Sequence, residues 1–384
     1  MFNNRAVIWV LFFSFFQLQA MLPLACNGNW LNDAFIDPSD GKLDMSNWLL
    51  ERDGLMPVPI IITEPAIGYG GGLALVYFHD KVGSRKGSPP SVSAVAGAAT
   101  ENGTWFAGGG HLGIWKNDTI RYSGGLGTGL VKMDYYGRSG NQEQWQDGGI
   151  RFETDALFFV QELLFRIYES KFFAGLGYVL IDTANSFEHY SEDLTQELPG
   201  FDFDSRSAAV NLMLSYDSRD NIFTPSNGMA AEAKVMLFDD IWGSDDTFQK
   251  YLASLLYYNS LTENLVLGLR GSGQVIEGDA PFYSYPFIDM RGVKAMQYQG
   301  DMTLLGEVEV RWSFTPRWAL VGFGGAGKAY NDGGKEDSDV IYSKGIGIRY
   351  LIASKLGLQV GLDVAQGPDD TAFYIQFGSS WSLK

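Results

Sequence analysis

Gly306-Glu-Val-Glu-Val-Arg-Trp-Ser-Phe314 is the stretch that decides the fold class of this chain. Its two valines, its tryptophan and its phenylalanine fall on one face of a strand, and its charged and hydroxyl residues fall on the other. In a soluble sheet the apolar face would be the core. In an outer-membrane barrel the polarity inverts, because apolar side chains meet lipid and charged side chains line the lumen. The rest of the chain decides between these two interpretations.

The same alternation recurs along the chain from Pro57 onward, and the face opposite the apolar one is glycine, charge or amide. About fifteen such segments follow one another without an intervening helical pattern, which favours a transmembrane antiparallel β-barrel over a soluble sandwich. Bacterial barrels of this kind close with even strand numbers, and Val58–Thr63 is a candidate for one more strand. We therefore predict sixteen strands, with fourteen as the alternative.

The N-terminus predicts an exported protein. Arg5 precedes the apolar run Val7–Phe16, which has the length of a signal-peptide core and is too short to span a membrane. We predict a signal peptide over residues 1–20, with a second candidate cleavage position before Cys26, the only cysteine. Residues 27–56 read as a short periplasmic segment with one short helix near Asp44–Glu51, and residues 57–384 as the barrel.

The connections and the aromatic residues support an outer-membrane location. From residue 134 onward long and short links alternate, as expected for long loops outside the cell and tight turns in the periplasm. One link, 219–227, sits in a short position yet is longer than the other short links. The last strand is predicted to carry Phe373, Ile375, Phe377 and Trp381 on one face. The tryptophans near strand ends are typical of the aromatic girdles at the two membrane interfaces: Trp105, Trp115, Trp312, Trp318 and Trp381.

Several kinds of chemistry are disfavoured. A net charge of −17 argues against nucleic-acid binding, which needs clustered Lys and Arg. Three scattered histidines and one cysteine predict neither a metal site nor a catalytic triad, so we expect no cofactor and no enzymatic activity. Gly322–Lys328 matches a phosphate-loop pattern, but no helix pattern follows it and Ala329 replaces the hydroxyl residue, so we expect no nucleotide binding.

Five blocks together resemble one family. Tyr216-Asp-Ser-Arg-Asp-Asn221, followed by Pro225-Ser-Asn-Gly228, is similar to the strand-and-turn signature of the outer-membrane assembly-factor superfamily, the BamA/TamA-like bacterial surface antigen barrels. Met290-Arg-Gly-Val293 resembles the family's lumen-loop motif, and Gly306–Arg311 resembles the strand that follows it. Phe323-Gly-Gly-Ala-Gly327 and the closing Phe373–Gly378 complete the resemblance.

The resemblance implies a sixteen-stranded barrel whose long loop folds into the lumen, where the loop arginine pairs with acids of the wall. The site residues it implies are Met290, Arg291, Gly292 and Val293 of the loop, and Tyr216, Asp217, Arg219, Asp220 and Asn221 of the strand motif. Gly325 occupies the position of the family's aspartate, so Glu309 is the expected partner of Arg291, with Glu307 in reserve.

The resemblance also implies a function and partners. It implies an outer-membrane protein related to insertases and translocases, acting in outer-membrane assembly or transport. Residues 27–56 are too short for the family's periplasmic POTRA domains, so the chain resembles a branch without them. A narrow solute channel and a structural or lipid-organising barrel remain the alternatives. The expected partners are membrane lipids and lipopolysaccharide, with other outer-membrane proteins or a second copy as further candidates.

Overall fold

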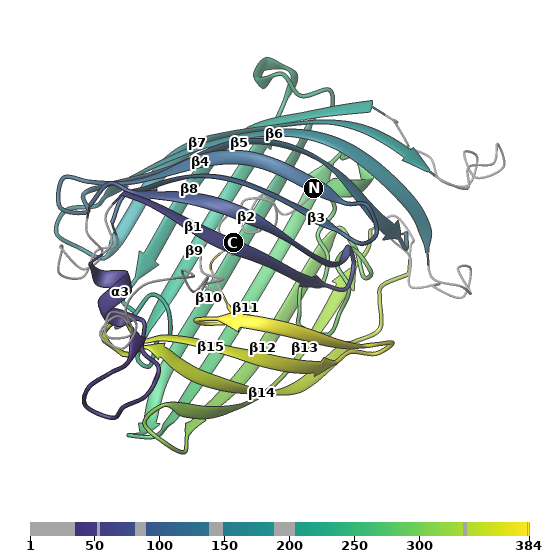
Figure 1. Cartoon of the computed structure of the whole chain (residues 1–384). Helices are drawn as coiled ribbons and strands as arrows, with labels where there is room; N and C mark the ends of the chain where they lie inside the picture. Colours follow the sequence, from purple (N-terminus) through teal and green to yellow (C-terminus); the bar gives the residue numbers. More distant parts are fainter. Residues whose placement is uncertain are drawn as a thin grey trace.

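The computed structural model describes residues 35–51, 54–80, 90–137, 149–187, 204–332, 336–381 and 383. The predicted signal peptide and Cys26 lie outside these residues. Sixteen strands form one antiparallel sheet in which every strand pairs with its neighbours in sequence. The sheet curves into a barrel (Figure 1). The predicted sixteen-stranded barrel is confirmed, and the first strand includes the candidate Val58–Thr63.

The strand lengths vary around the barrel, and the longest strands lie in the first half of the chain. The strands are β1 Gly54–Glu64, β2 Gly68–Phe78, β3 Val92–Thr100, β4 Trp105–Trp115, β5 Ile120–Tyr135, β6 Ile150–Arg166, β7 Phe172–Phe187, β8 Asp204–Asp217, β9 Gly228–Phe238, β10 Phe248–Thr262, β11 Leu265–Gly278, β12 Met302–Ser313, β13 Trp318–Tyr330, β14 Ile341–Ala353, β15 Leu358–Gln366 and β16 Thr371–Phe377. Short helical turns are α3 Ser46–Leu50, η3 Asp240–Trp242, η4 Phe282–Ser284 and η5 Ser354–Leu356.

The outer surface of the barrel is apolar, as the alternating pattern predicts. Large apolar side chains on alternate strand positions remain exposed, which a water-soluble surface rarely tolerates over so wide an area. Examples from around the barrel are Leu73, Val95, Leu126, Leu176, Leu212, Val308 and Ile346. The opposite positions of β12, Glu307, Glu309 and Arg311, are buried in the interior. The apolar face therefore meets lipid, and the charged face lines the lumen.

Near the N-terminal end of the described chain lies α3, which confirms the short helix expected near Asp44–Glu51. None of the helices within the described ranges has the length and apolarity needed to cross a membrane.

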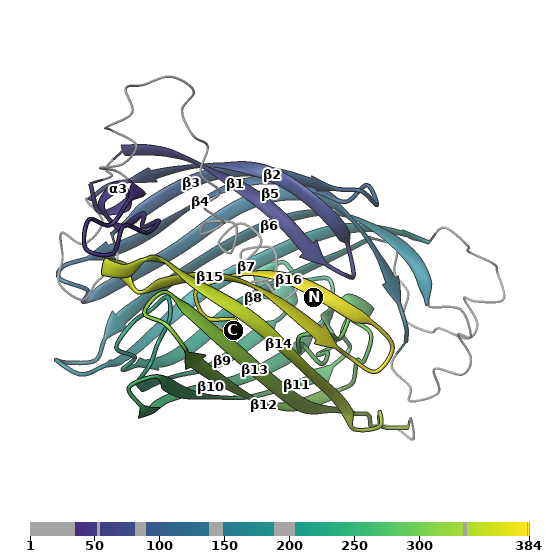
Figure 2. The same ribbon diagram turned by 60° about the horizontal axis from the view of Figure 1, so that its bottom comes forward.

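The sheet has a seam between its first and last strands. β1 and β16 lie next to each other, but they are the two ends of the hydrogen-bonded strand order, and no ladder joins them among the described residues. Figure 2 shows β1 in purple and β16 in yellow at these two ends. β16 has 7 residues and β1 has 11, so β16 is too short to match the whole length of the β1 edge.

Two features differ from the sequence-based expectation. Trp381 does not lie on the last strand or in an interfacial girdle, because β16 ends at Phe377 and Trp381 is buried in the interior. The other four tryptophans of the predicted girdle lie at or near strand ends and are exposed to the outer surface. The link 79–91 is long although it lies at the rim of the short turns. From β5 onward the alternation of link lengths has two exceptions, the long link 218–227 at the rim of the short turns and the short link 367–370 at the rim of the long loops.

The link lengths predict the orientation of the barrel. We expect a cysteine placed at Glu336, in the long β13–β14 link, to react with an impermeant maleimide on intact cells when Cys26 is replaced by Ser. A cysteine at Thr262, beside the tight β10–β11 turn, should react only after the outer membrane is permeabilised. Labelling of Thr262→Cys alone on intact cells would reverse the orientation.

Candidate functional site

A long loop, residues 279–301, leaves β11 and folds into the barrel interior instead of extending from the rim. Its first turn packs Phe282 against Phe152 of β6, with ring centroids 5.2 Å apart. Tyr283 donates a hydrogen bond to the Ser205 hydroxyl of β8 at 2.9 Å. Lys250 Nζ of β10 donates to the Ser284 carbonyl oxygen at 3.0 Å. Because separate parts of the wall hold it, we call this segment the lumen loop.

Arg291 lies at the centre of a buried ionic network. Its Nη2 is 2.8 Å from Glu309 Oε2, and its Nη1 is 2.8 Å from Asp363 Oδ2 of β15. The side chains of Arg291 and Asp363 are 8% and 0% exposed. Arg349 of β14 binds the same Asp363 carboxylate, so two guanidinium groups face two carboxylates. The Arg291 guanidinium also lies 3.5 Å from the ring centroid of Phe323. Such charge-assisted contacts are directional and fix the loop arginine against the wall.

Glu307, the reserve partner, does not contact Arg291. It forms a separate ion pair with Arg270 of β11 at 2.5 Å, and Arg270 also lies 3.3 Å from Asp289 of the lumen loop. Gly325 stands where the family has an aspartate, so that carboxylate is missing here. Asp363, which lies on another strand, supplies a carboxylate to Arg291 instead. The lumen loop therefore joins two ionic clusters of the wall, one through Asp289 and the other through Arg291.

The remaining residues of the loop motif shape its tip. Met290 and Val293 are buried, and the Val293 amide donates to the Met290 carbonyl oxygen at 3.0 Å. Gly292 has φ +88°, a conformation that favours glycine, and its amide donates to the Tyr374 hydroxyl of β16. A Cβ added at Gly325 would lie 2.6 Å from Met290 Sδ. The glycine-rich segment Gly322–Lys328 lies within strand β13 and makes room for the loop.

The Tyr216–Asn221 motif builds the turn 218–227 at the other end of the interior. Asp217, at the end of β8, binds Arg219 through both carboxylate oxygens, at 3.0 and 2.8 Å. Asp220 accepts backbone hydrogen bonds from Ser226 and Asn227, which closes the turn. Asn221 Nδ2 donates to the Leu356 carbonyl oxygen at 2.8 Å. The turn consequently reaches from β8 to the β14–β15 turn, which is far away in the strand order.

Tyr216 itself has a different environment from the polar residues of its motif. Its ring packs on Phe172 of β7, directly opposite it in the ladder, with centroids 4.7 Å apart. This cross-strand aromatic pair stabilises the end of the β7–β8 ladder.

The chain after β16, residues 378–381 and 383, turns into the interior, and we call it the C-terminal tail. Gly378 has φ +72°, and the Ser379 amide donates to the Phe223 carbonyl oxygen of the 218–227 turn at 2.5 Å. The Ser380 hydroxyl accepts hydrogen bonds from Arg291 at 3.1 Å and from Arg349 at 3.3 Å. Trp381 packs in a cluster with Ala230, Leu256 and Tyr258 of β9 and β10. The tail thus links the ionic network of the lumen loop to the opposite wall.

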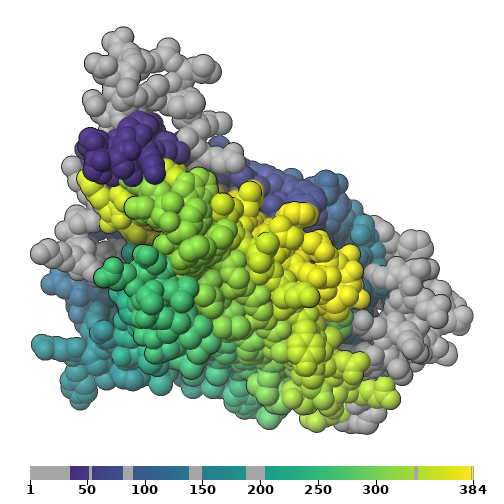
Figure 3. All heavy atoms as spheres, turned by 90° about the horizontal axis from the view of Figure 1, so that it is seen from below, coloured from purple at the N-terminus to yellow at the C-terminus, as the bar shows by residue number. Residues whose placement is uncertain are grey.

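Residues 35–51 form a strap along the short-turn rim before the chain enters β1. The Met45 amide donates to the Ile352 carbonyl oxygen at 2.6 Å, and the Lys355 amide donates to Ser46 Oγ at 3.0 Å. Figure 3 shows these purple residues packed against green and yellow C-terminal strands. Because β15 and β16 separate β14 from β1 in the sheet order, the strap bridges the seam.

Arg317, in the β12–β13 turn, holds the strap through three carboxylates. It lies 2.6 Å from Asp37, 2.7 Å from Asp40 and 2.5 Å from Asp44. Burial raises the pKa of Asp44, but hydrogen bonds from Ser354, Ser46 and Arg317 outweigh burial and hold that pKa well below 3.8. The hydrogen bond from Arg317 likewise lowers the pKa of Asp40. Stabilisation from depressed carboxyl pKa values is present at neutral pH and is lost as the pH falls below about 4.

We expect Arg317→Ala to release the strap. Asp44, whose side chain is 5% exposed, would lose its buried partner. The free energy that holds the strap on the barrel should fall by about 3 kcal/mol, at the low end for a broken buried ion pair, because Asp37 and Asp40 stay partly hydrated. Trypsin cleavage after Lys42 should therefore accelerate about 100-fold at neutral pH. Wild-type protein should become equally sensitive to an acid-active protease only below pH 4. Arg151→Ala, which breaks an exposed pair with Asp134, is the control, and equal cleavage of both variants would contradict the anchoring role.

Sequence reasoning missed Asp363, Arg349, Arg270 and Arg317. In the sequence each of them is a charged residue on the lumen-facing side of an alternating strand or in a tight turn. Such a position does not reveal which distant residue the charge will pair with. Within the described ranges, no three His, Cys, Asp or Glu side chains cluster so as to hold a metal ion.

Comparison with known proteins identifies the family. The Omp85 superfamily domain matches residues 108–381. Among solved structures, BamA from Haemophilus ducreyi lacking POTRA domains 1–3 is similar, with a TM-score of 0.57 and 13% identity over 86% of this chain and 70% of that one. CdiB from Escherichia coli has a TM-score of 0.58 and 10% identity over 83% of this chain. CdiB from Acinetobacter baumannii has a TM-score of 0.55 and 10% identity over 84% of this chain.

The chain spans less than two thirds of the two CdiB chains, 61% and 58%. No curated protein matches the sequence. At these identities the structural likeness shows the barrel fold, whereas the domain match covers most of the chain, including every motif of the site. The chain therefore belongs to the Omp85 superfamily and is a β-barrel protein of the bacterial outer membrane.

Proposed function

We propose that this barrel assists the assembly of other proteins into the outer membrane or their transport across it, without enzymatic chemistry. The seam carries the proposal. β1 and β16 have no ladder between them among the described strands, so the seam is the place where an incoming strand could join the sheet. Unpaired sheet edges are templates for strand addition, and a barrel that only needed stability would close this edge.

The network around Arg291 supports the same function. The lumen loop contacts Asp363 of β15 and Tyr374 of β16 through Arg291 and Gly292. These contacts hold β15 and β16, the last two strands before the seam, from the inside. The strap crosses the seam at the short-turn rim. Position and stability of the seam are therefore controlled by elements that are not part of the sheet.

A narrow channel for small solutes has less support. The interior contains the lumen loop and the C-terminal tail, whose buried side chains include Tyr283, Ile288 and Trp381. The apolar outer surface accounts for contact with membrane lipids, and the partner proteins would be unfolded barrel substrates that meet the seam.

The test is assisted folding in proteoliposomes. We expect liposomes that contain the full-length chain to fold a urea-unfolded outer-membrane barrel several-fold faster than empty liposomes, with heat-modifiable gel mobility as the readout. A disulfide introduced between β1 and β16 should remove the acceleration, and reduction should restore it. Equal folding rates with and without the protein would contradict the proposal, and a large steady conductance in planar bilayers would favour the channel.

A further inference from the structure

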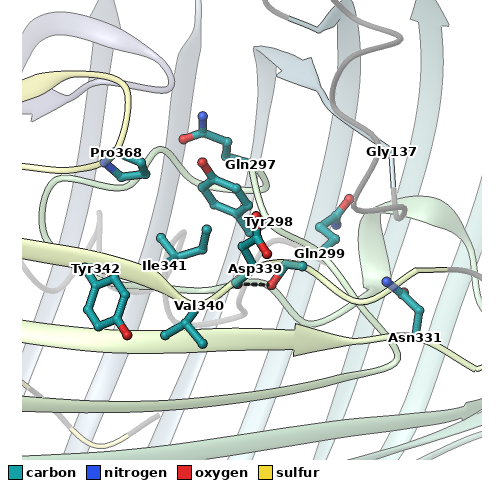
Figure 4. Close-up of a pocket in the computed structure, with 11 residues that line it drawn as sticks. Gly137, Gln297, Tyr298, Gln299, Asn331, Asp339, Val340, Ile341, Tyr342 and Pro368 are labelled. Carbon is teal, nitrogen blue, oxygen red and sulfur yellow. Dashed lines mark hydrogen bonds between the residues drawn. The ribbon is translucent and has the colours of Figure 1, made fainter.

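Two histidines that are scattered in the sequence meet on the outer surface of the barrel, near the short-turn rim. His79 Nε2, just after β2, and His111 Nδ1 of β4 each lie 2.8 Å from the hydroxyl oxygen of Ser93 of β3. We call these three residues the outer histidine cluster. It is separate from the buried ionic network around Arg291. It is also separate from the cavity of about 400 Å³ at the long-loop rim, which Tyr298 of the lumen loop lines (Figure 4).

The side chains of the cluster point away from the lumen. Tyr77 and Val95 are 47% and 59% exposed on the outer surface, and they lie two residues from His79 and Ser93. Side chains two residues apart share one face of a strand. His111 lies directly opposite Ser93 in the β3–β4 ladder and therefore shares that face. His79 is exposed and His111 is partly exposed, so both rings are accessible from the membrane side.

Aromatic side chains place the cluster at the level of the lipid headgroups. The ring of His111 stacks on that of Trp115 with centroids 6.2 Å apart, and Trp115 stacks on Tyr122 of β5 at 5.6 Å. Trp115 is exposed at the end of β4, as Trp312 and Trp318 are at the same rim on β12 and β13. Tryptophan and tyrosine collect at the membrane–water interface. The cluster therefore faces the headgroups of one leaflet, which is the periplasmic leaflet in the orientation expected from the link lengths.

The shared hydroxyl determines where the two rings carry their hydrogens. Ser93 has one hydroxyl hydrogen, so it donates to one ring nitrogen and accepts from the other. When both rings are neutral, one of the two far nitrogens, His79 Nδ1 and His111 Nε2, carries a hydrogen and the other does not. Uptake of one proton puts a hydrogen on both and gives the cluster a positive charge. Among the described residues neither far nitrogen has a hydrogen-bond partner, so the charged cluster offers two donors to an anion.

A phosphodiester matches these two donors. It has one negative charge and two free oxygens that accept hydrogen bonds, and charge-assisted hydrogen bonds of this kind are the strong ones. The centroids of the His79 and His111 rings are 5.2 Å apart, so one phosphate group can reach both rings. Toward the membrane centre, Leu75 and Val95 lie opposite each other in the β2–β3 ladder and are exposed, which provides an apolar surface for acyl chains.

We propose that the outer histidine cluster binds the phosphate group of a phospholipid in the leaflet at the short-turn rim, with uptake of one proton. On the outward side and in the adjoining links, the other described groups that can ionise are Tyr77, Tyr122, Asp80 and Lys116. Tyrosine hydroxyls stay protonated between pH 6 and 8, and aspartate and lysine keep their opposite charges. Within this pH range the histidines therefore decide how the charge of the site changes.

The test is lipid binding by the full-length chain in detergent, followed by the fluorescence anisotropy of acyl-labelled lipids. We expect phosphatidylglycerol to bind at least about tenfold more tightly than diacylglycerol with the same chains, because only the former carries a phosphate. Its affinity should be at least about threefold higher at pH 6 than at pH 8, because the protonated cluster binds the anion. His79→Phe and His111→Phe should each remove this dependence on pH and most of the preference for the phospholipid.

A pair of hydroxyl deletions provides the control. Ser93→Ala should weaken phosphatidylglycerol binding, because the two rings lose the group that orients them. Thr128→Ala should bind like the wild type, since Thr128 is an exposed hydroxyl residue on the outer face of β5 that lies outside the cluster. Heat-modifiable gel mobility of every variant establishes that the barrel has folded.

Three results would overturn the proposal. The first is equal affinity for phosphatidylglycerol and diacylglycerol at both pH values, and the second is equal losses in Ser93→Ala and Thr128→Ala. The third is competition by glycerol phosphate at the same concentration as the lipid, which would assign the site to free phosphate. The cluster takes no part in the seam, so this test and the assisted-folding test can fail separately.

Discussion

Replacing Arg291 by Ala should lower the free energy of unfolding by about 3–5 kcal/mol, the cost of breaking one side of a buried ion pair. Among the described residues, Arg291 is the only hydrogen-bond donor to the Glu309 carboxylate, whose side chain is 10% exposed. Its removal would leave that carboxylate uncompensated in the interior, while Asp363 would keep Arg349. The measurement is urea-induced unfolding from lipid bilayers, followed by tryptophan fluorescence and heat-modifiable gel mobility.

A double-mutant cycle tests the pairing itself. Glu309→Ala should cost about as much as Arg291→Ala, and the double variant no more than either single variant, because no charge is then left alone. Asp363→Ala should cost more than Glu309→Ala, because it leaves both Arg291 and Arg349 without this carboxylate. Arg206→Ala, at a pair whose side chains are 52% and 41% exposed, is the control and should leave the free energy of unfolding nearly unchanged, because both partners stay hydrated. Additive losses at Arg291 and Glu309 would show that the two residues do not act as a pair.

Trp381→Ala should detach the C-terminal tail from the interior. The side chain is 4% exposed, and truncation of a buried tryptophan costs about 3–5 kcal/mol. Because the tail and the turn 218–227 meet across the interior near the short-turn rim, we expect the fraction of time spent in conducting states in planar bilayers to rise at least tenfold. The wild-type protein should show only brief openings.

The control for the tail is a second tryptophan. Trp318→Ala removes a side chain that is 39% exposed on the outer surface, and it should leave conductance unchanged. Conductance that is unaffected by Trp381→Ala, in protein that retains heat-modifiable mobility, would contradict a closing role for the tail. Equal increases in both variants would point instead to a general loss of stability.

The alternating segments were sufficient to predict the barrel. The two-residue period of β12 assigns each side chain to lipid or lumen without knowledge of the neighbouring strands, because side-chain direction along a strand is a local property. The count of sixteen strands followed from the number of alternating segments and the even strand number of such barrels, whereas the infolded loop and the family followed from the resemblance of short contiguous motifs to known relatives. The glycines of β13 were also interpretable locally, as small residues on a crowded inner face.

The partners of the buried charges could not be predicted from the sequence. Asp363 lies 72 residues from Arg291, and Asp44 lies 273 residues from Arg317, and no local pattern connects them. The sequence placed Trp381 on the last strand because its spacing fits, but a positive φ at Gly378 turns the chain into the interior. The seam, the strap and the tail exist only once the sheet has curved round to bring β14–β16 beside β1. The sequence alone therefore determined which face each strand presents, and only the tertiary structure decided which distant charges meet, because curvature of the whole sheet sets those distances.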